Sequence, residues 1–121
     1  MTSESMARAF LALDEVAALP PNWDSYGSRP IQGATVDAAR RLLHIGEVEG
    51  LPEAHVVPIS GGGVQLEWYT PTRGLELVIH ADGECEYVLV QRPDNAVVEG
   101  RLPSMDEKRV RDYMRRFMHA G

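Results

Sequence analysis

The sequence predicts an α+β fold: a four-stranded antiparallel β-meander with two N-terminal helices and one C-terminal helix packed on one face. Apolar residues recur at helical spacing near both ends, four central segments alternate as strands do, and the connections between those segments are short. The chain has 121 residues, of which 44% are hydrophobic and 25% charged. Such a length and composition are typical of one globular domain, so we expect residues 1–121 to form a single domain.

The N-terminal third predicts two helices. The first runs from Ser5 to Ala18 and ends before two prolines, because proline disfavours the α conformation in the residue before it. Its apolar stripe consists of Met6, Phe10, Leu13 and Ala17. The second runs from Gly33 or Ala34 to His44, after which two glycines, Gly46 and Gly50, release the chain. Its buried residues should be Val36, Ala39, Leu42 and Leu43.

Four segments then alternate between apolar and polar residues: His55–Ile59, Val64–Thr70, Leu75–Ala81 and Glu84–Gln91. Their short connections favour hairpins, because a parallel pair needs a crossover of about a dozen residues or more. The connecting segments are a glycine run at 61–63, a four-residue loop at 71–74 and an Ala-Asp-Gly turn at 81–83. Pro58 lies within the first segment and predicts that this strand is at the edge of the sheet.

The turns predict which side chains share a face. A four-residue loop at 71–74 pairs Trp68 with Leu77 and Tyr69 with Glu76, and a three-residue turn pairs Leu77 with Tyr87. The apolar face, which the helices should cover, carries Val57, Ile59, Val64, Leu66, Trp68, Leu75, Leu77, Ile79, Cys85, Tyr87 and Leu89. The reverse face carries Gln65, Glu67, Tyr69, Glu76, Val78, His80, Glu84, Glu86 and Val88.

The last predicted helix spans residues 104–119. Ser104 and Glu107 have the spacing of a capping box, and five apolar residues follow on one stripe. The stripe consists of Val110, Tyr113, Met114, Phe117 and Met118. Basic residues occupy the other face and can lie against the acidic body of the domain.

The formal net charge of -6 is unevenly distributed, because residues 45–100 hold ten acidic and two basic residues. An acidic domain repels nucleic acid and attracts basic partners. Residues 1–19 are interrupted by charges and resemble neither a signal peptide nor a membrane span. The single cysteine, Cys85, cannot form an internal disulfide, so nothing indicates an oxidising compartment and we expect a cytoplasmic protein. Its place on the apolar face predicts an inert buried thiol.

The reverse face of the predicted sheet allows three interpretations. It is a solvated surface, a protein-binding surface, or a metal or acid/base site around Glu67, His80 and Glu86. The third is the weakest, because zinc sites usually have three or four closely spaced ligands and only one imidazole lies on this face. We therefore expect no metal, no cofactor and no catalytic residue. The binding interpretation uses Gln65, Glu67, Tyr69, Glu76, His80, Glu84 and Glu86.

The loop after the first helix carries two aromatic residues, Trp23 and Tyr26, within the segment Asn22–Gly27. Asn22 and Asp24 can accept hydrogen bonds from nearby backbone amides as Asx turns. Trp23 either fills a gap between the helices and the sheet or, with Tyr26, contacts a partner, since both residue types are frequent interface hot spots.

Two blocks resemble a group of small bacterial proteins of unknown function. The first is Asn22-Trp23-Asp24-x-Tyr26-Gly27-x-x-Pro30-Ile31, and the second is Gly62-Gly63-x-Gln65-Leu66-Glu67-Trp68 followed by Leu75-Glu76-Leu77. The resemblance covers about residues 11–90 and implies a bacterial or mobile-element origin. It implies no activity.

The leading functional hypothesis is a non-enzymatic protein that binds and blocks a basic partner protein, as antitoxins, immunity proteins and anti-defence inhibitors do. The first alternative is a small metal-dependent or acid/base enzyme that uses Glu67, His80 and Glu86. The second is self-association, as a homodimer, through His55–Ile59, through Glu84–Gln91 or through the apolar stripe of the last helix.

Overall fold

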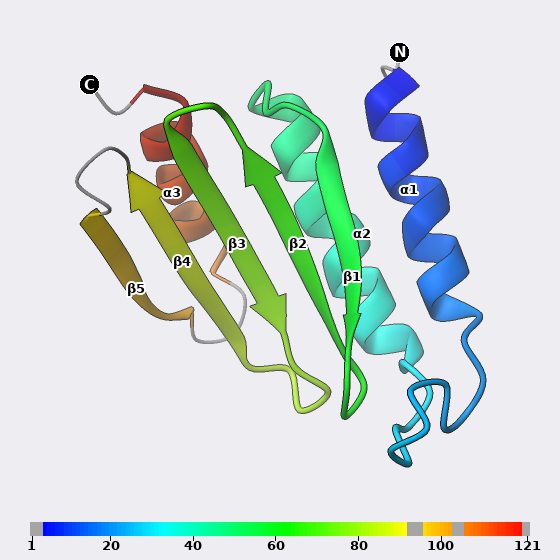
Figure 1. Cartoon of the computed structure of the whole chain (residues 1–121). Helices are drawn as coiled ribbons and strands as arrows, with labels where there is room; N and C mark the ends of the chain where they lie inside the picture. Colours follow the sequence, from blue (N-terminus) through cyan, green and yellow to red (C-terminus); the bar gives the residue numbers. More distant parts are fainter. Residues whose placement is uncertain (1–3, 92–95, 103–105, 120–121) are drawn as a thin grey trace.

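In the described part of the chain, three helices cover one face of a five-stranded antiparallel sheet, and the opposite face carries no helix (Figure 1). The computed structural model describes residues 4–91, 96–102 and 106–119. The elements are α1 (Glu4–Ala17), α2 (Gly33–Val48), β1 (Ala54–Ile59), β2 (Gly63–Tyr69), β3 (Arg73–Ile79), β4 (Cys85–Gln91), β5 (Ala96–Leu102) and α3 (Glu107–His119). The α+β class and the antiparallel sheet are confirmed. No helix in the described ranges is long and apolar enough to cross a membrane.

The sheet has one strand more than the sequence analysis predicts. The strands lie in chain order, and β5 pairs with β4 from Gln91 and Ala96 at one end to Cys85 and Leu102 at the other. The alternation of apolar and polar residues in β5 is short and is interrupted by Gly100, so the sequence pattern of a strand is weak there. The strand is held by Leu102, which is fully buried, and by Tyr87, which packs against Gly100. As a result β4 is an internal strand.

The first strand is an edge strand, as Pro58 predicts, but its faces are reversed relative to the prediction. Val57 pairs with Gln65 and is 39% exposed, while Ala54 is buried on the helix side. Ile59 pairs with Gly63 and also lies on the uncovered face. The glycine turn sets this register, and a shift of one residue moves every side chain of a strand to the other face.

The hairpin between β2 and β3 has a tighter turn than predicted. The Thr70 amide donates to the Arg73 carbonyl at 2.9 Å, so Pro71 and Thr72 alone form the turn. Trp68 consequently pairs with Leu75 and not with Leu77. The difference is two residues, which leaves each side chain on its predicted face. Between β3 and β4 the predicted pairing of Leu77 with Tyr87 is confirmed.

The core lies between the sheet and the helices. Trp68 and Phe117 are its largest fully buried side chains. Helix α2 continues past its predicted end because Gly46 lies inside it, where a Cβ atom would be 3.2 Å from the Trp68 ring. The helix ends at Val48, and Gly50, with a φ of +79°, allows the amides of Gly50 and Leu51 to bond back to the last turn.

Helix α3 begins at Glu107 and is capped by Asp106, whose Oδ1 accepts from the amides of Lys108 and Arg109. Ser104, the predicted cap, lies outside the described residues. The apolar stripe is confirmed, with Val110, Met114 and Phe117 buried and Tyr113 and Met118 partly buried.

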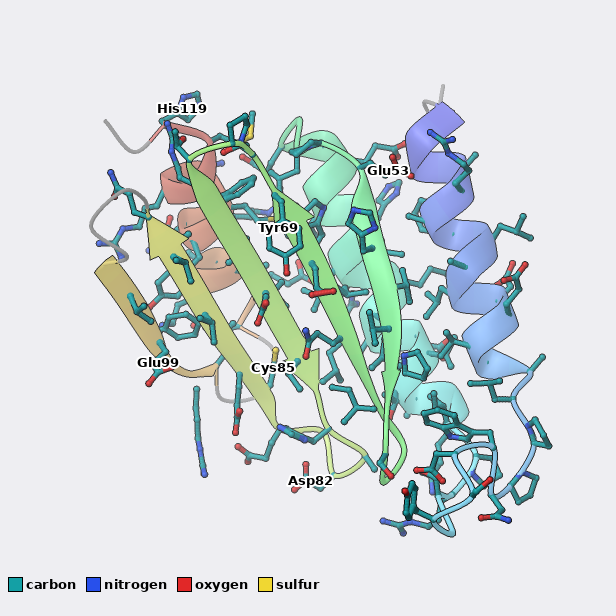
Figure 2. The ribbon with its side chains drawn as sticks, viewed as in Figure 1. Glu53, Tyr69, Asp82, Cys85, Glu99 and His119 are labelled. Atoms are coloured by element: carbon teal, nitrogen blue, oxygen red, sulfur yellow. The ribbon has the colours of Figure 1, made fainter. Side chains whose placement is uncertain are left out.

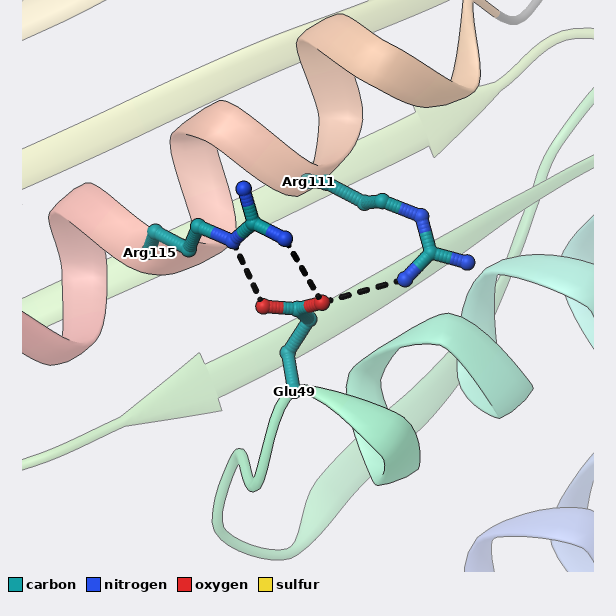
Figure 3. A network of polar contacts seen from close by, with 3 residues as sticks. All are labelled: Glu49, Arg111 and Arg115. Carbon is teal, nitrogen blue, oxygen red and sulfur yellow. Dashed lines mark hydrogen bonds and ion pairs between the residues drawn. The ribbon is translucent and has the colours of Figure 1, made fainter.

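The basic face of α3 contacts the end of α2 through one carboxylate. Glu49 binds Arg111 at 3.0 Å and Arg115 at 2.9 Å (Figure 3). The Glu49 side chain is only 13% exposed. The hydrogen bond from Arg115 is the main cause that lowers the Glu49 pKa, and the bond from Arg111 adds to it. The expectation that the basic helix lies against the acidic body is confirmed at this contact.

Candidate functional site

The uncovered face of the sheet, hereafter the outer face, is built from alternate residues of all five strands (Figure 1). Five of the reverse-face residues proposed for binding lie on it within β2, β3 and β4, because alternation sorts the aliphatic residues toward the helices. The other two, His80 and Glu84, flank the β3–β4 turn, where the backbone bond between them continues the same alternation and His80 lies 3.5 Å from Glu86. Tyr69 and Glu84 are exposed, and the remaining five are half-buried: Gln65, Glu67, Glu76, His80 and Glu86. Strands β1 and β5 also contribute to this face, which the sequence pattern did not predict, with His55, Val57, Val97, Glu99 and Arg101.

Acidic side chains dominate the outer face. Across the strands, His55 pairs with Glu67, Glu67 with Glu76, Glu76 with Val88, and Val88 with Glu99. The next row contains Glu86 and Arg101, which are cross-strand partners. The described carboxylates on this face are Glu67, Glu76, Glu84, Glu86 and Glu99. They outnumber the single arginine, so the face attracts cations.

Tyr69 organises two of these carboxylates. Its ring lies over Gly74, where a Cβ atom would be 3.1 Å from two ring carbons. Its hydroxyl oxygen is 2.7 Å from Glu67 Oε2 and 3.0 Å from Glu76 Oε1 (Figure 2 labels Tyr69). Partial burial, followed by the two carboxylates, raises the Tyr69 pKa above its usual range. The phenol therefore keeps its proton and can donate it to one carboxylate at a time.

The Glu67, His80 and Glu86 trio is not assembled. Glu86 Oε1 lies 3.5 Å from His80 Nε2, an atom that is buried without a hydrogen-bond partner among the described residues. Glu67 pairs instead with Glu76, four residues from His80, which is roughly 13 Å because a strand advances by about 3.3 Å per residue. Within residues 4–91, 96–102 and 106–119, no three His, Cys, Asp or Glu side chains are placed to hold a metal ion.

A shallow groove lies at the β2–β3 end of the outer face. Its volume is about 500 Å³, and it is lined by Tyr69, Thr70, Pro71, Arg73, Gly74, Glu76 and Val90. Exposed apolar residues border the acidic row, with Tyr69 at 47% and Val97 at 52% exposure. The outer face therefore offers apolar contact area beside its charges.

The aromatic loop is held rigidly by its own polar residues. Asp24 Oδ1 accepts from the amides of Tyr26 at 2.9 Å and Ser28 at 3.3 Å, and its other oxygen accepts from the Ser60 hydroxyl. The bond from Ser60, more than those from the amides, lowers the Asp24 pKa. The predicted Asx turn is confirmed at Asp24. Asn22 does not form one, because its Oδ1 accepts from the amide of Gly27, five residues further on, at 2.6 Å. The Ser60 contact ties the loop to the β1–β2 turn.

The two aromatic residues of this loop differ in exposure. Trp23 is half-buried, and its Nε1 atom is buried without a hydrogen-bond partner among the described residues. Tyr26 is 89% exposed. Tyr26 is therefore free to contact a partner, and both interpretations of Trp23, as a gap filler and as a contact residue, stay predictions.

Cys85 is buried on the helix side of β4 (Figure 2). Burial, with a smaller effect from Glu86, raises the pKa of its thiol to about 11. A thiol with such a pKa is protonated at neutral pH and is a poor nucleophile. This matches the inert thiol that the sequence predicts.

The comparisons add no assignment to this geometry. The resemblance carried by the Asn22–Ile31 and Gly62–Trp68 blocks stays a prediction. No protein-family model, no curated protein and no solved structure matches the chain.

Proposed function

We propose that this protein is a non-enzymatic, cytoplasmic binding protein whose outer face docks on a basic surface of another protein and blocks it. Antitoxins, immunity proteins and anti-defence inhibitors act in this way. The observation that carries the proposal is the concentration of five carboxylates on one face that no described helix covers. Arg101 is the one arginine or lysine that strand alternation places on this face in the described residues, and Arg73 reaches only the groove at its β2–β3 end.

Charge and apolar area serve different parts of the proposed docking. Clustered carboxylates steer a cationic surface toward the face and raise the association rate, an effect that falls with salt. Tyr69 then supplies a large amphipathic contact near the centre of the acidic row. Lysine or arginine side chains of the partner would add a positive charge beside Glu67 and Glu76, whose carboxylates otherwise have only the neutral Tyr69 hydroxyl as a donor.

The proposal is tested with two charge-matched triple variants. The first reverses the outer face with Glu67→Lys, Glu76→Lys and Glu86→Lys. The second reverses three exposed acids of the helix layer with Glu15→Lys, Asp37→Lys and Asp112→Lys. Both sets change the formal net charge of -6 by the same amount, so they differ only in where the charge lies.

The partner is first identified by crosslinking from Tyr69 and is then purified, and its affinity for each variant is measured by titration calorimetry at several salt concentrations. We expect the outer-face variant to bind on the order of a hundredfold more weakly, because each close charge pair contributes roughly a kcal/mol or more. The helix-layer variant should bind nearly as the parent does. Equal weakening by both sets, or full binding by the outer-face variant, would refute the proposal.

A further inference from the structure

The two edges of the sheet differ in how open they are. Along a strand of an antiparallel sheet, the backbone N–H and C=O groups of successive residues point alternately to the strand on one side and to the strand on the other. The Thr70–Arg73 bond shows that even-numbered residues of β2 bond to β3, so odd-numbered residues of β2 bond to β1. Their partners in β1 are His55 and Val57, and the backbone groups of Val56 and Pro58 therefore point away from the sheet. Pro58 has no amide proton to offer, and α1 packs against β1. This edge is therefore blocked.

Along its described length, the β5 edge has neither a proline among its outward-facing residues nor a helix packed against it. The bond from the His80 amide to the Glu84 carbonyl, at 2.8 Å, sets the alternation in β4. It directs the backbone groups of Val97, Glu99 and Arg101 away from β4. Each of these residues has an amide proton, and Val97 and Val98 are 52% and 40% exposed. An open edge with exposed valines is a template for another strand.

The charges on this edge are self-complementary. Glu99 and Arg101 both point to the outer face, and neither forms an ion pair within the described part of the chain (Figure 2 labels Glu99). Antiparallel pairing of β5 with an identical strand, centred on Gly100, places each Glu99 opposite an Arg101. Opposite charges at directly paired positions stabilise a strand pair.

We propose that a second copy of this chain adds to β5 about a two-fold axis through Gly100, which joins the two sheets into one of ten strands. The outward backbone groups of Glu99 and Arg101 then exchange hydrogen bonds with those of the second copy. On the helix side, Val98 lies beside the second copy's Leu102. The two acidic outer faces become one continuous surface.

Neighbouring registers are disfavoured. A two-fold axis through Glu99 pairs the two Glu99 side chains, and one through Arg101 pairs the two Arg101 side chains, so both registers place like charges opposite each other. A register that pairs odd-numbered with even-numbered residues sets the outer face of one copy level with the helix side of the other. The centre at Gly100 also suits a closely spaced pair, in which the two Cα atoms approach to about 4.5 Å. No side chain is present there, and the Tyr87 hydroxyl fills the helix side, 2.9 Å from where a Cβ atom would be.

The test uses sedimentation velocity on the full chain over a wide concentration range. The parent should dimerise. Glu99→Arg places arginines opposite arginines, and Arg101→Glu places glutamates opposite glutamates, so each variant alone should dimerise about tenfold or more weakly. An equimolar mixture of the two restores both ion pairs and should form a one-to-one heterodimer. Glu84→Arg, an equal charge change on the same face, should dimerise as the parent does.

Two outcomes would overturn the proposal. The first is a parent protein that stays monomeric at every concentration. This result would overturn the proposal even if the β5 edge binds a different protein. The second is a mixture of Glu99→Arg and Arg101→Glu that dimerises no better than its components. Unfolding cannot imitate the expected result, because misfolded variants would not regain dimerisation on mixing. The outer-face reversal at Glu67, Glu76 and Glu86 leaves Glu99 and Arg101 intact, so the two proposals fail independently.

Discussion

Tyr87 of β4 and Tyr113 of α3 stack with ring centroids 4.0 Å apart, and their hydroxyl oxygens are 2.7 Å apart. The two hydroxyls share one hydrogen bond, in which either can be the donor. Because Tyr87 also lies against Gly100, one ring joins the last helix to the last strand. These two elements close the far side of the core from α1.

A double-mutant cycle should measure this contact. Tyr87→Phe and Tyr113→Phe should each reduce the free energy of unfolding by about 1 kcal/mol, because each removes one partner of a partly buried hydrogen bond. The double variant should lose little more than either single variant, as measured by urea denaturation. Tyr26→Phe, at a residue that is 89% exposed, is the control and should have no effect. Additive losses at Tyr87 and Tyr113 would contradict the geometry.

Glu49→Gln should destabilise the protein in a pH-dependent way. The folded state lowers the Glu49 pKa through the Arg115 and Arg111 bonds, so it favours the ionised form. This stabilisation is complete above the unfolded-state pKa of about 4.3 and is lost as the pH falls through the lower folded-state pKa. Denaturation midpoints of parent and variant should therefore differ at neutral pH and converge in acid.

A control for Glu49 is Glu53→Gln. Glu53 pairs with Arg8 at 3.5 Å on the surface, with 42% of its side chain exposed. Exposed pairs of this kind contribute little. Glu53→Gln should therefore leave the denaturation midpoint nearly unchanged. If the midpoints of the parent and Glu49→Gln differ equally at every pH, the stability lost in Glu49→Gln does not come from the carboxylate charge.

Gly63→Ala should be strongly destabilising for lack of space. A Cβ atom at Gly63 would lie 2.8 Å from the carbonyl oxygen of Ile79, a backbone atom in the neighbouring strand. We expect a loss of about 2 kcal/mol or more in the free energy of unfolding, since packed backbone must shift. Gly33→Ala is the matched control, because no atom lies within 4 Å of its added Cβ atom. It should be neutral or stabilising by up to about 1 kcal/mol, since alanine favours helices.

The titration of Tyr69 should report the two carboxylates beside it. In the parent, its phenol should ionise well above the usual pKa of about 10. The double variant Glu67→Gln, Glu76→Gln should lower that pKa, because it removes two negative charges, but burial should keep it above the usual value. Carbon NMR of the tyrosine ring measures this directly. Glu84→Gln is the control, and an unchanged pKa in the double variant would mean that the hydroxyl does not contact Glu67 and Glu76.

Features that depend on neighbours in the chain could be read from the sequence. The α+β class, the faces of β2, β3 and β4, and the stripe of α3 follow from periods of two and of about 3.6 residues. Pro58 indicated an edge strand correctly, since a missing amide proton is a property of the residue itself. The Asx turns of Asp24 are local as well, because the side chain bonds to amides only two and four residues away.

Features that depend on distant partners could not be read in this way. The end of α2 is an example, since Gly46 looked like a helix breaker until the Trp68 ring was found beside it. The apposition of Glu67 and Glu76 under Tyr69 is another, because it rests on a two-residue turn where a four-residue loop was expected. The same shift separates Glu67 from His80, which removes the metal-site arrangement.

The sequence alone therefore established which side chains of β2, β3 and β4 turn away from the core, since alternation within a strand needs no knowledge of its neighbours. Tertiary structure decided which of those side chains meet, how β1 is turned, and that β5 rather than β4 ends the sheet. None of the three predicted routes to self-association is open in the described residues, because Pro58 and α1 block β1, β5 covers β4, and the core buries Val110, Met114 and Phe117 of α3. Pairing between strands is a long-range choice made by packing, and many registers preserve the same alternation.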